Sequence, residues 1–126
     1  MNRNSFQSPL PPPAKRPRVT IVSPVEEALH EWVDDINPDA RKHLVACASA
    51  IFEEFTARVS SFSEDDLAAC CWIAIKHDGL QRQTPNADYM SYVCETSARS
   101  LVRHEARVLA AVDWKIRRIL RSRGLA

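Results

Sequence analysis

Histidine and cysteine side chains can act as nucleophiles, general bases or metal ligands, and this chain has four of each. The cysteines contain no Cys-x-x-Cys pair and no Cys-His spacing that suits zinc. The histidines fall on separate predicted helices, where no nucleophile–base pair and no set of metal ligands can be identified. We therefore expect no catalytic residue, no bound metal and no cofactor, and buried free thiols in a reducing compartment. The eight residues are Cys47, Cys70, Cys71, Cys94, His30, His43, His77 and His104.

Lys76 is the charged residue with the most unusual sequence surroundings. It ends a run from Leu67 to Ile75 in which every side chain is apolar or small, and His77 and Asp78 follow it. A helix that is apolar on all sides is surrounded by other helices. A lysine in the last turn of such a helix suits the negative end of the helix dipole. On this evidence alone Lys76 does no more than end a buried helix.

Helix-start and helix-stop signals indicate the elements that position Lys76. Only two glycines occur in 126 residues, which argues against a β-sandwich and against a phosphate-binding loop. A capping box at 23–26, the Asn37-Pro38 pair, a cap at 63–66 and a Thr96-Ser97 cap each precede a run with helical apolar periodicity. The sequence predicts an all-α fold, a five-helix bundle around a buried third helix. Its helices span about 24–36, 38–58, 67–79 (after the cap at 63–66), 86–95 and 98–112, and a basic amphipathic helix follows.

Charge is distributed unevenly along the chain. Residues 1–22 hold four basic residues, no acid and five of the eight prolines, so we expect a disordered tail. Its cluster Lys15, Arg16, Pro17 and Arg18 is a candidate nuclear localisation signal for an import receptor; the alternative is a basic tail with no address. We expect a protein shared between nucleus and cytoplasm, the host nucleus if the chain is viral. No segment has the roughly 18 consecutive apolar residues of a membrane span.

The order and spacing of several short segments resemble the cyclin box. The family's buried third helix ends in a motif of the type Leu-Ala-Ser-Lys-Phe-Glu-Glu, and residues 73–79 occupy the corresponding place. Its fifth helix has the pattern Met-Glu-x-x-Leu-Leu-x-x-Leu-x-Phe-x-Leu, which residues 104–116 match in type and spacing. Residues 84–90, residues 50–55 and Trp32 resemble further family positions. The resemblance covers about residues 25–116.

The resemblance implies a role for Lys76. In cyclins a lysine at this position and a glutamate at the position of Glu105 stand on neighbouring helices and grip the regulatory helix of a cyclin-dependent kinase. The lysine donates to backbone carbonyls of the partner, and the glutamate keeps the ammonium charged and aimed. His77 and Asp78 replace the usual aromatic and glutamate beside the lysine. The implied kinase-binding set is Lys76, Glu105, His77 and Asp78.

The resemblance also sets the expected domain limits and function. Residues 1–22 form the tail, 23–116 a single cyclin box and 117–126 a basic helical extension. The implied function is a non-enzymatic regulator of a cyclin-dependent kinase in cell-cycle or transcription control. The alternative is a nucleic-acid or transcription-factor module that uses the basic C-terminal helix, although residues 23–112 hold fifteen acidic against eight basic residues. Residues 118–120 have the form of an Arg-x-Leu docking motif, which more often simply packs.

Overall fold

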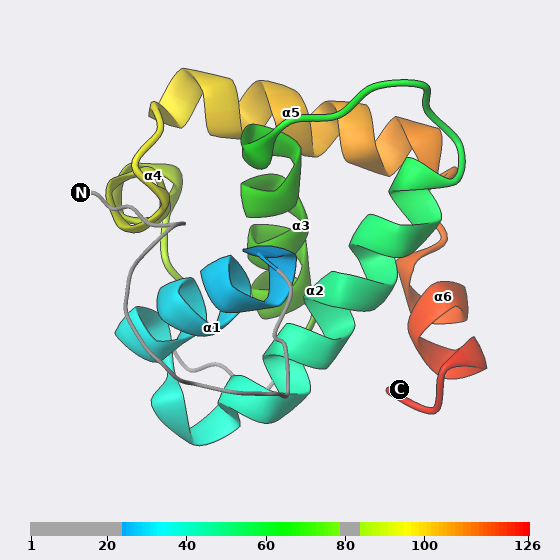
Figure 1. The fold of residues 1–126 in the computed structure, drawn as a ribbon, viewed down its shortest axis with the longest axis horizontal. Coiled ribbons are helices and arrows are strands. Elements are labelled where there is room, and N and C mark those ends of the chain that lie inside the picture. The colour runs from blue at the N-terminus through cyan, green and yellow to red at the C-terminus, as the bar shows by residue number, and fades with distance from the viewer. Residues whose placement is uncertain (1–23, 79–83) are drawn as a thin grey trace, which may run out of the picture.

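The computed structural model describes residues 24–78 and 84–126, and these residues form helices, turns and no strand. The prediction of an all-α fold is confirmed for this part of the chain. The predicted tail at 1–22, with Lys15, Arg16, Pro17 and Arg18, lies outside the described residues. The elements are α1 (Pro24–Ile36), the 3-10 turn η1 (Pro38–Ala40), α2 (Arg41–Thr56), α3 (Glu64–Asp78), α4 (Ala87–Cys94), α5 (Ala98–Ala111) and α6 (Ile116–Ser122) (Figure 1).

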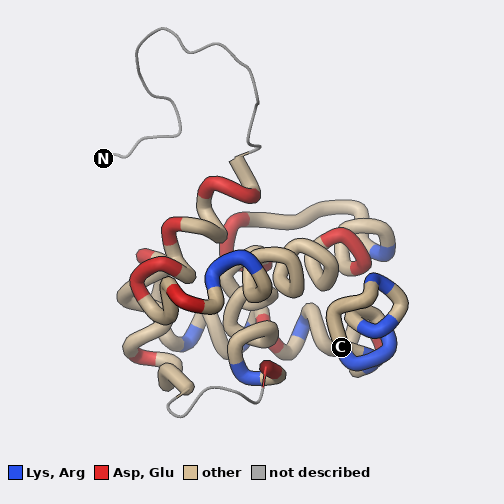
Figure 2. The backbone as a smooth tube through the Cα atoms, turned by 90° about the horizontal axis from the view of Figure 1, so that it is seen from below, with Lys and Arg blue, Asp and Glu red and all other residues tan. Residues whose placement is uncertain are grey.

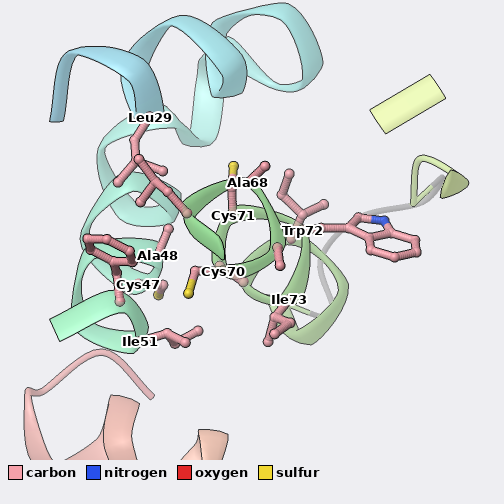
Figure 3. Close-up of a cluster of buried hydrophobic side chains, with 14 of the residues drawn as sticks. Leu29, Cys47, Ala48, Ile51, Ala68, Cys70, Cys71, Trp72 and Ile73 are labelled. Carbon is pink, nitrogen blue, oxygen red and sulfur yellow. The ribbon is translucent and has the colours of Figure 1, made fainter. Parts of the chain in front are cut away.

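Helix α3 is the centre of the bundle. Every residue from Asp66 to Ile75 is buried, and α2 and α5 make the most extensive contacts with it. Seen along α3, Cys70 lies on the side of Cys47 and Ile51, and Trp72 lies on the side away from α2 (Figure 3). Alanine and cysteine side chains leave room for neighbouring helices to approach closely on all these sides. The prediction of a buried third helix is therefore confirmed.

Side-chain caps fix several helix starts. The Oδ1 of Asn86 accepts the N–H of Tyr89 at 2.8 Å, and the Oγ of Ser97 accepts the N–H of Ser100 at 3.0 Å, as expected for that cap. The second helix differs from its prediction. Residues 38–40 form a 3-10 turn, the α-helix proper begins at Arg41, and the side chain of Asn37 forms no capping hydrogen bond. Without such a bond to hold the first turn, the chain enters the helix through the tighter 3-10 geometry.

Helix α6 closes the bundle on the side opposite α4 (Figure 1). Its buried residues Ile116, Ile119 and Leu120 follow helical spacing and pack against the core, where α6 contacts α2. Arg123 binds Glu53 of α2 through an ion pair of 2.7 Å. Among the described helices, none has the length and apolar character needed to cross a membrane.

The cysteines supply a test of this packing. All four are free and buried, and burial raises the pKa of Cys47 to about 11 and that of Cys71 to about 12. The pKa values of Cys70 and Cys94 are raised by the same cause. A thiol-specific chromogenic reagent at pH 8 should therefore label none of the four before unfolding and all four after it.

The same shifts fix the sign of a pH dependence. Thiols of the unfolded chain ionise near pH 8.5, whereas the folded chain keeps these protons to higher pH. The free energy of unfolding should thus be unaffected by the thiols below that pH and should fall as the pH rises from about 8.5 toward 11. In the labelling experiment described above, a reaction of any of the four cysteines that is faster than global unfolding would contradict the buried packing of these thiols.

Candidate functional site

Lys76 and Glu105 form an ion pair between α3 and α5. Lys76 lies in the last turn of α3, and Glu105 lies in the middle of α5, which packs against α3. The lysine side chain is 36% exposed and the glutamate side chain 16% exposed, so the pair lies at the edge of the core. Glu105 is thus largely withdrawn from water, and the ammonium remains accessible to a partner.

Trp72 holds Lys76 from a second direction. The Nζ of Lys76 lies 3.6 Å from the centroid of the Trp72 ring, which is a close cation–π contact. The Nε1 of Trp72 donates to the carbonyl of Pro85 at 2.9 Å, so the ring itself is fixed. An ammonium has three N–H donors. With one directed to Glu105 and the ring covering one side, a donor remains for a partner carbonyl.

The role of Trp72 was missed in the sequence, where it counted as one more apolar residue of a buried helix. The spacing carries the signal. Trp72 and Lys76 are four positions apart, and residues at that spacing meet on one face of a helix. Val102 is exposed on α5 three positions before Glu105, so it extends the same face with an apolar side chain.

Asp78 points away from the Lys76–Glu105 pair. Its Oδ1 lies 3.5 Å from the Nε2 of His43 on α2, and its side chain is almost fully buried. The same His43 nitrogen lies 3.5 Å from the Sγ of Cys47. The side chain of His77 is partly exposed and forms no hydrogen bond or ion pair with other described residues. Of the four residues proposed from the resemblance, the structure brings together Lys76 and Glu105 and directs Asp78 toward α2.

A second polar network joins α5 to the start of α3. The side chain of Asp66 is 1% exposed; its Oδ2 accepts the Ser63 N–H at 2.9 Å and a guanidinium N–H of Arg107 at 2.6 Å. The Nε2 of His104 lies 4.0 Å from the Oδ1 of Asp66. Asp66 therefore completes the capping box of α3 and carries an ion pair to α5.

Ser100 and His104 are adjacent in this network. The Ser100 Oγ lies 3.2 Å from the Nδ1 of His104, but it donates to the Oδ2 of Asp65 at 2.6 Å. The Nδ1 also lies 2.8 Å from the carbonyl of Ser100, to which it donates. With that nitrogen holding its proton, it cannot accept one from the hydroxyl, so we interpret these contacts as a fastening between α3 and α5. No group of three potential metal ligands occurs within residues 24–78 and 84–126.

No protein-family model, curated protein or solved structure matches this chain. The function of the Lys76–Glu105 pair is therefore inferred from its geometry and from the resemblance of the sequence to the cyclin box.

The Arg-x-Leu triplet at 118–120 packs inward in part. Leu120 and Ile119 are both buried in the core cluster, and Arg118 is exposed. A docking motif of this form has to offer its leucine to the partner. In the folded chain that leucine belongs to the contact between α6 and the core.

Proposed function

We propose that this protein is a cyclin-like regulatory subunit that binds a cyclin-dependent kinase through the kinase's regulatory helix. The observation that supports the proposal is the Lys76–Glu105 ion pair between α3 and α5, at the two positions that the resemblance singles out. The helices α1 to α5, with α3 buried at their centre, support the proposal of a cyclin box over residues 23–116.

The arrangement suits the capture of a helix from another protein. An ammonium held by a carboxylate and an aromatic ring loses little side-chain entropy when it binds. It can donate to a backbone carbonyl that lacks a partner at a helix C-terminus. The flanking Val102 side chain offers apolar contact area beside the charge.

Binding of this kind would regulate the kinase by population shift. A partner that contacts the regulatory helix better in one position increases the fraction of kinase in that state. In the active state the kinase's own lysine–glutamate pair is complete. With His77 and Asp78 following the lysine, the protein either promotes that state or occupies the kinase without activating it. A kinase assay with purified components distinguishes the two.

Removing either member of the pair should strongly weaken kinase binding. Lys76→Ala and Glu105→Ala are each expected to weaken kinase binding by about 2–5 kcal/mol, since a charge in the interface then lacks its partner. That range is roughly 30-fold to several thousand-fold in Kd. Titration of a purified cyclin-dependent kinase by calorimetry measures the loss, and circular dichroism checks that the variants stay helical.

Arg41→Ala is the matched control, because Arg41 forms an exposed ion pair with Asp34 at 2.8 Å between α1 and α2. It should bind the kinase as the wild type does. Equal binding by all four proteins, or no binding by the wild type, would refute the assignment. The proposed nuclear location, through residues 15–18 and an import receptor, is tested separately by the distribution of a Lys15→Ala/Arg16→Ala variant in cells.

A further inference from the structure

A cavity of about 460 Å³ lies between three segments. They are the C-terminal end of α2, the turn that joins α5 to α6, and α6 itself. Three cationic side chains line it: Arg58 from the turn after α2, Lys115 from the turn after α5 and Arg118 from α6. Val112 and Ile119 provide apolar walls. Neither Lys76 nor Glu105 lines this cavity, so it is separate from the proposed kinase-binding site.

The cavity lining carries more positive than negative charge, because it contains two acidic and three basic residues. Glu54 lines the cavity, but it forms an ion pair with Arg58 and lies 3.9 Å from Arg123. Asp113 lies 3.5 Å from Lys115, and its carboxylate is mostly in solvent. Arg118 forms no ion pair with the described part of the chain. The guanidinium of Arg118 and the Lys115 donors that are not directed at Asp113 are therefore available to an anion.

The surface around the cavity has the same sign. Arg117 and Arg121 are exposed on α6 and, within the described residues, have no acidic partner. Figure 2 shows Lys and Arg gathered around the C-terminal end, whereas α1 carries mainly acidic residues. An anionic partner is consequently attracted to α6 and repelled by the acidic body.

The turn before α6 contains an exposed aromatic residue, Trp114, between Asp113 and Lys115, which both line the cavity. Asp113 and Trp114 both have φ of 60°, the left-handed region that non-glycine residues seldom adopt. Hydrogen bonds from Asp113 N–H to Ala110 and from Trp114 N–H to Leu109 hold this conformation. Trp114 is 68% exposed as a result. Two residues in succession in this seldom-adopted conformation, one of them an exposed tryptophan between two residues that line the cavity, are typical of a binding surface.

We propose that the cavity binds the phosphate of a phosphorylated serine or threonine in a segment of a partner protein. A phosphomonoester carries nearly two charges and three acceptor oxygens, which match the guanidinium of Arg118, unpaired within the described residues, and the Lys115 donors that Asp113 leaves free. Trp114 then contacts the residues next to the phosphate. A nucleic acid fits less well, because its phosphates form a long track that would extend from α6 over the acidic body.

The test uses the full chain and a mixture of twelve-residue peptides with a fixed central phosphoserine. The same mixture with serine and a single-stranded 20-mer of thymidine serve as competitors. Binding is followed by tryptophan fluorescence, since Trp114 is exposed whereas Trp32 and Trp72 are buried. The phosphoserine mixture should bind at least about tenfold more tightly than the serine mixture in 0.15 M salt.

Neighbouring arginines on α6 provide the matched variants. Arg118→Ala, which removes a residue of the cavity wall, should weaken binding at least about tenfold, whereas Arg117→Ala, outside the wall, should change it less than about twofold. Arg118→Lys should also weaken binding, because an ammonium lacks the guanidinium fork. Lys76→Ala should bind the phosphopeptides as the wild type does, so this proposal and the kinase proposal can fail separately.

Three outcomes overturn the proposal. Equal losses in Arg117→Ala and Arg118→Ala would mean diffuse attraction to a basic helix. Tighter binding of the oligonucleotide than of the phosphopeptides would assign the surface to nucleic acid. Binding of neither probe would mean that the cavity has no phosphate ligand of either kind.

Discussion

Exchanging the charges of Lys76 and Glu105 is expected to keep the folded bundle and to abolish kinase binding. In Lys76→Glu/Glu105→Lys, a carboxylate at the end of α3 and an ammonium on α5 can still pair, because the two positions face each other. In the double variant the ammonium belongs to α5 instead of α3. It therefore loses the contact with the Trp72 ring that Lys76 makes in the wild type. A partner carbonyl placed for a donor at position 76 would meet a carboxylate instead, which like-sign repulsion disfavours.

The two single charge reversals complete this experiment. Lys76→Glu alone brings two carboxylates together, and Glu105→Lys alone brings two ammonium groups together. Each should lower the free energy of unfolding by about 0.5–1 kcal/mol, a small value because water screens a pair at the edge of the core. Thermal unfolding should show recovery of this loss in the double variant, while a kinase titration shows none. Recovery of kinase binding together with stability would mean that the pair only fastens α3 to α5.

Helix order and the centre of the bundle could be predicted from sequence because the signals are local. Proline at 24 and 38, the serine caps at 63 and 97 and helical apolar spacing each act within a few residues. These signals placed the helix ends to within about three residues of those observed. They failed at the start of α2, where an asparagine–proline pair leads into a 3-10 turn.

The orientation of side chains around α3 could not be predicted in the same way. A helix with one apolar face is oriented by that face, but α3 is apolar on every side and has none. Whether Lys76 and Asp78 point to α5 or to α2 is therefore decided by how the neighbouring helices cross it. The pairing of Lys76 with Glu105, 29 positions along the chain, came from the family resemblance, and the chain order alone gave no sign that the Asp78 side chain lies against His43 of α2. The contact of Asp66 with Arg107, 41 positions away, has no local signal at all.

That contact is expected to be the most sensitive point of the fold. Arg107→Met should lower the free energy of unfolding by about 2–3 kcal/mol, since it leaves the Asp66 carboxylate buried with its charge unpaired. Losses of 3–5 kcal/mol are usual for a fully buried pair, and the lower value follows because the Arg107 side chain is 40% exposed. Methionine keeps an apolar contact with Phe55, over whose ring the guanidinium now lies at 5.0 Å. The midpoint of thermal unfolding should fall by more than about 8 °C.

Changing the other partner of the pair, Asp66, should lower the free energy of unfolding by less than Arg107→Met does. The difference identifies the unpaired buried charge as the cause of the larger loss. Asp66→Asn removes the buried charge and keeps an acceptor for the Ser63 N–H, and Arg107 can then turn to water; a loss of about 1 kcal/mol is expected. Arg103→Met is the control, because Arg103 is exposed on the same helix and has no acidic partner among the described residues. It should change stability by less than about 0.5 kcal/mol. Urea unfolding followed by circular dichroism ranks the three variants. If Arg107→Met were as stable as Arg103→Met, the Asp66 carboxylate would have to be stabilised by the capping box of α3 rather than by α5.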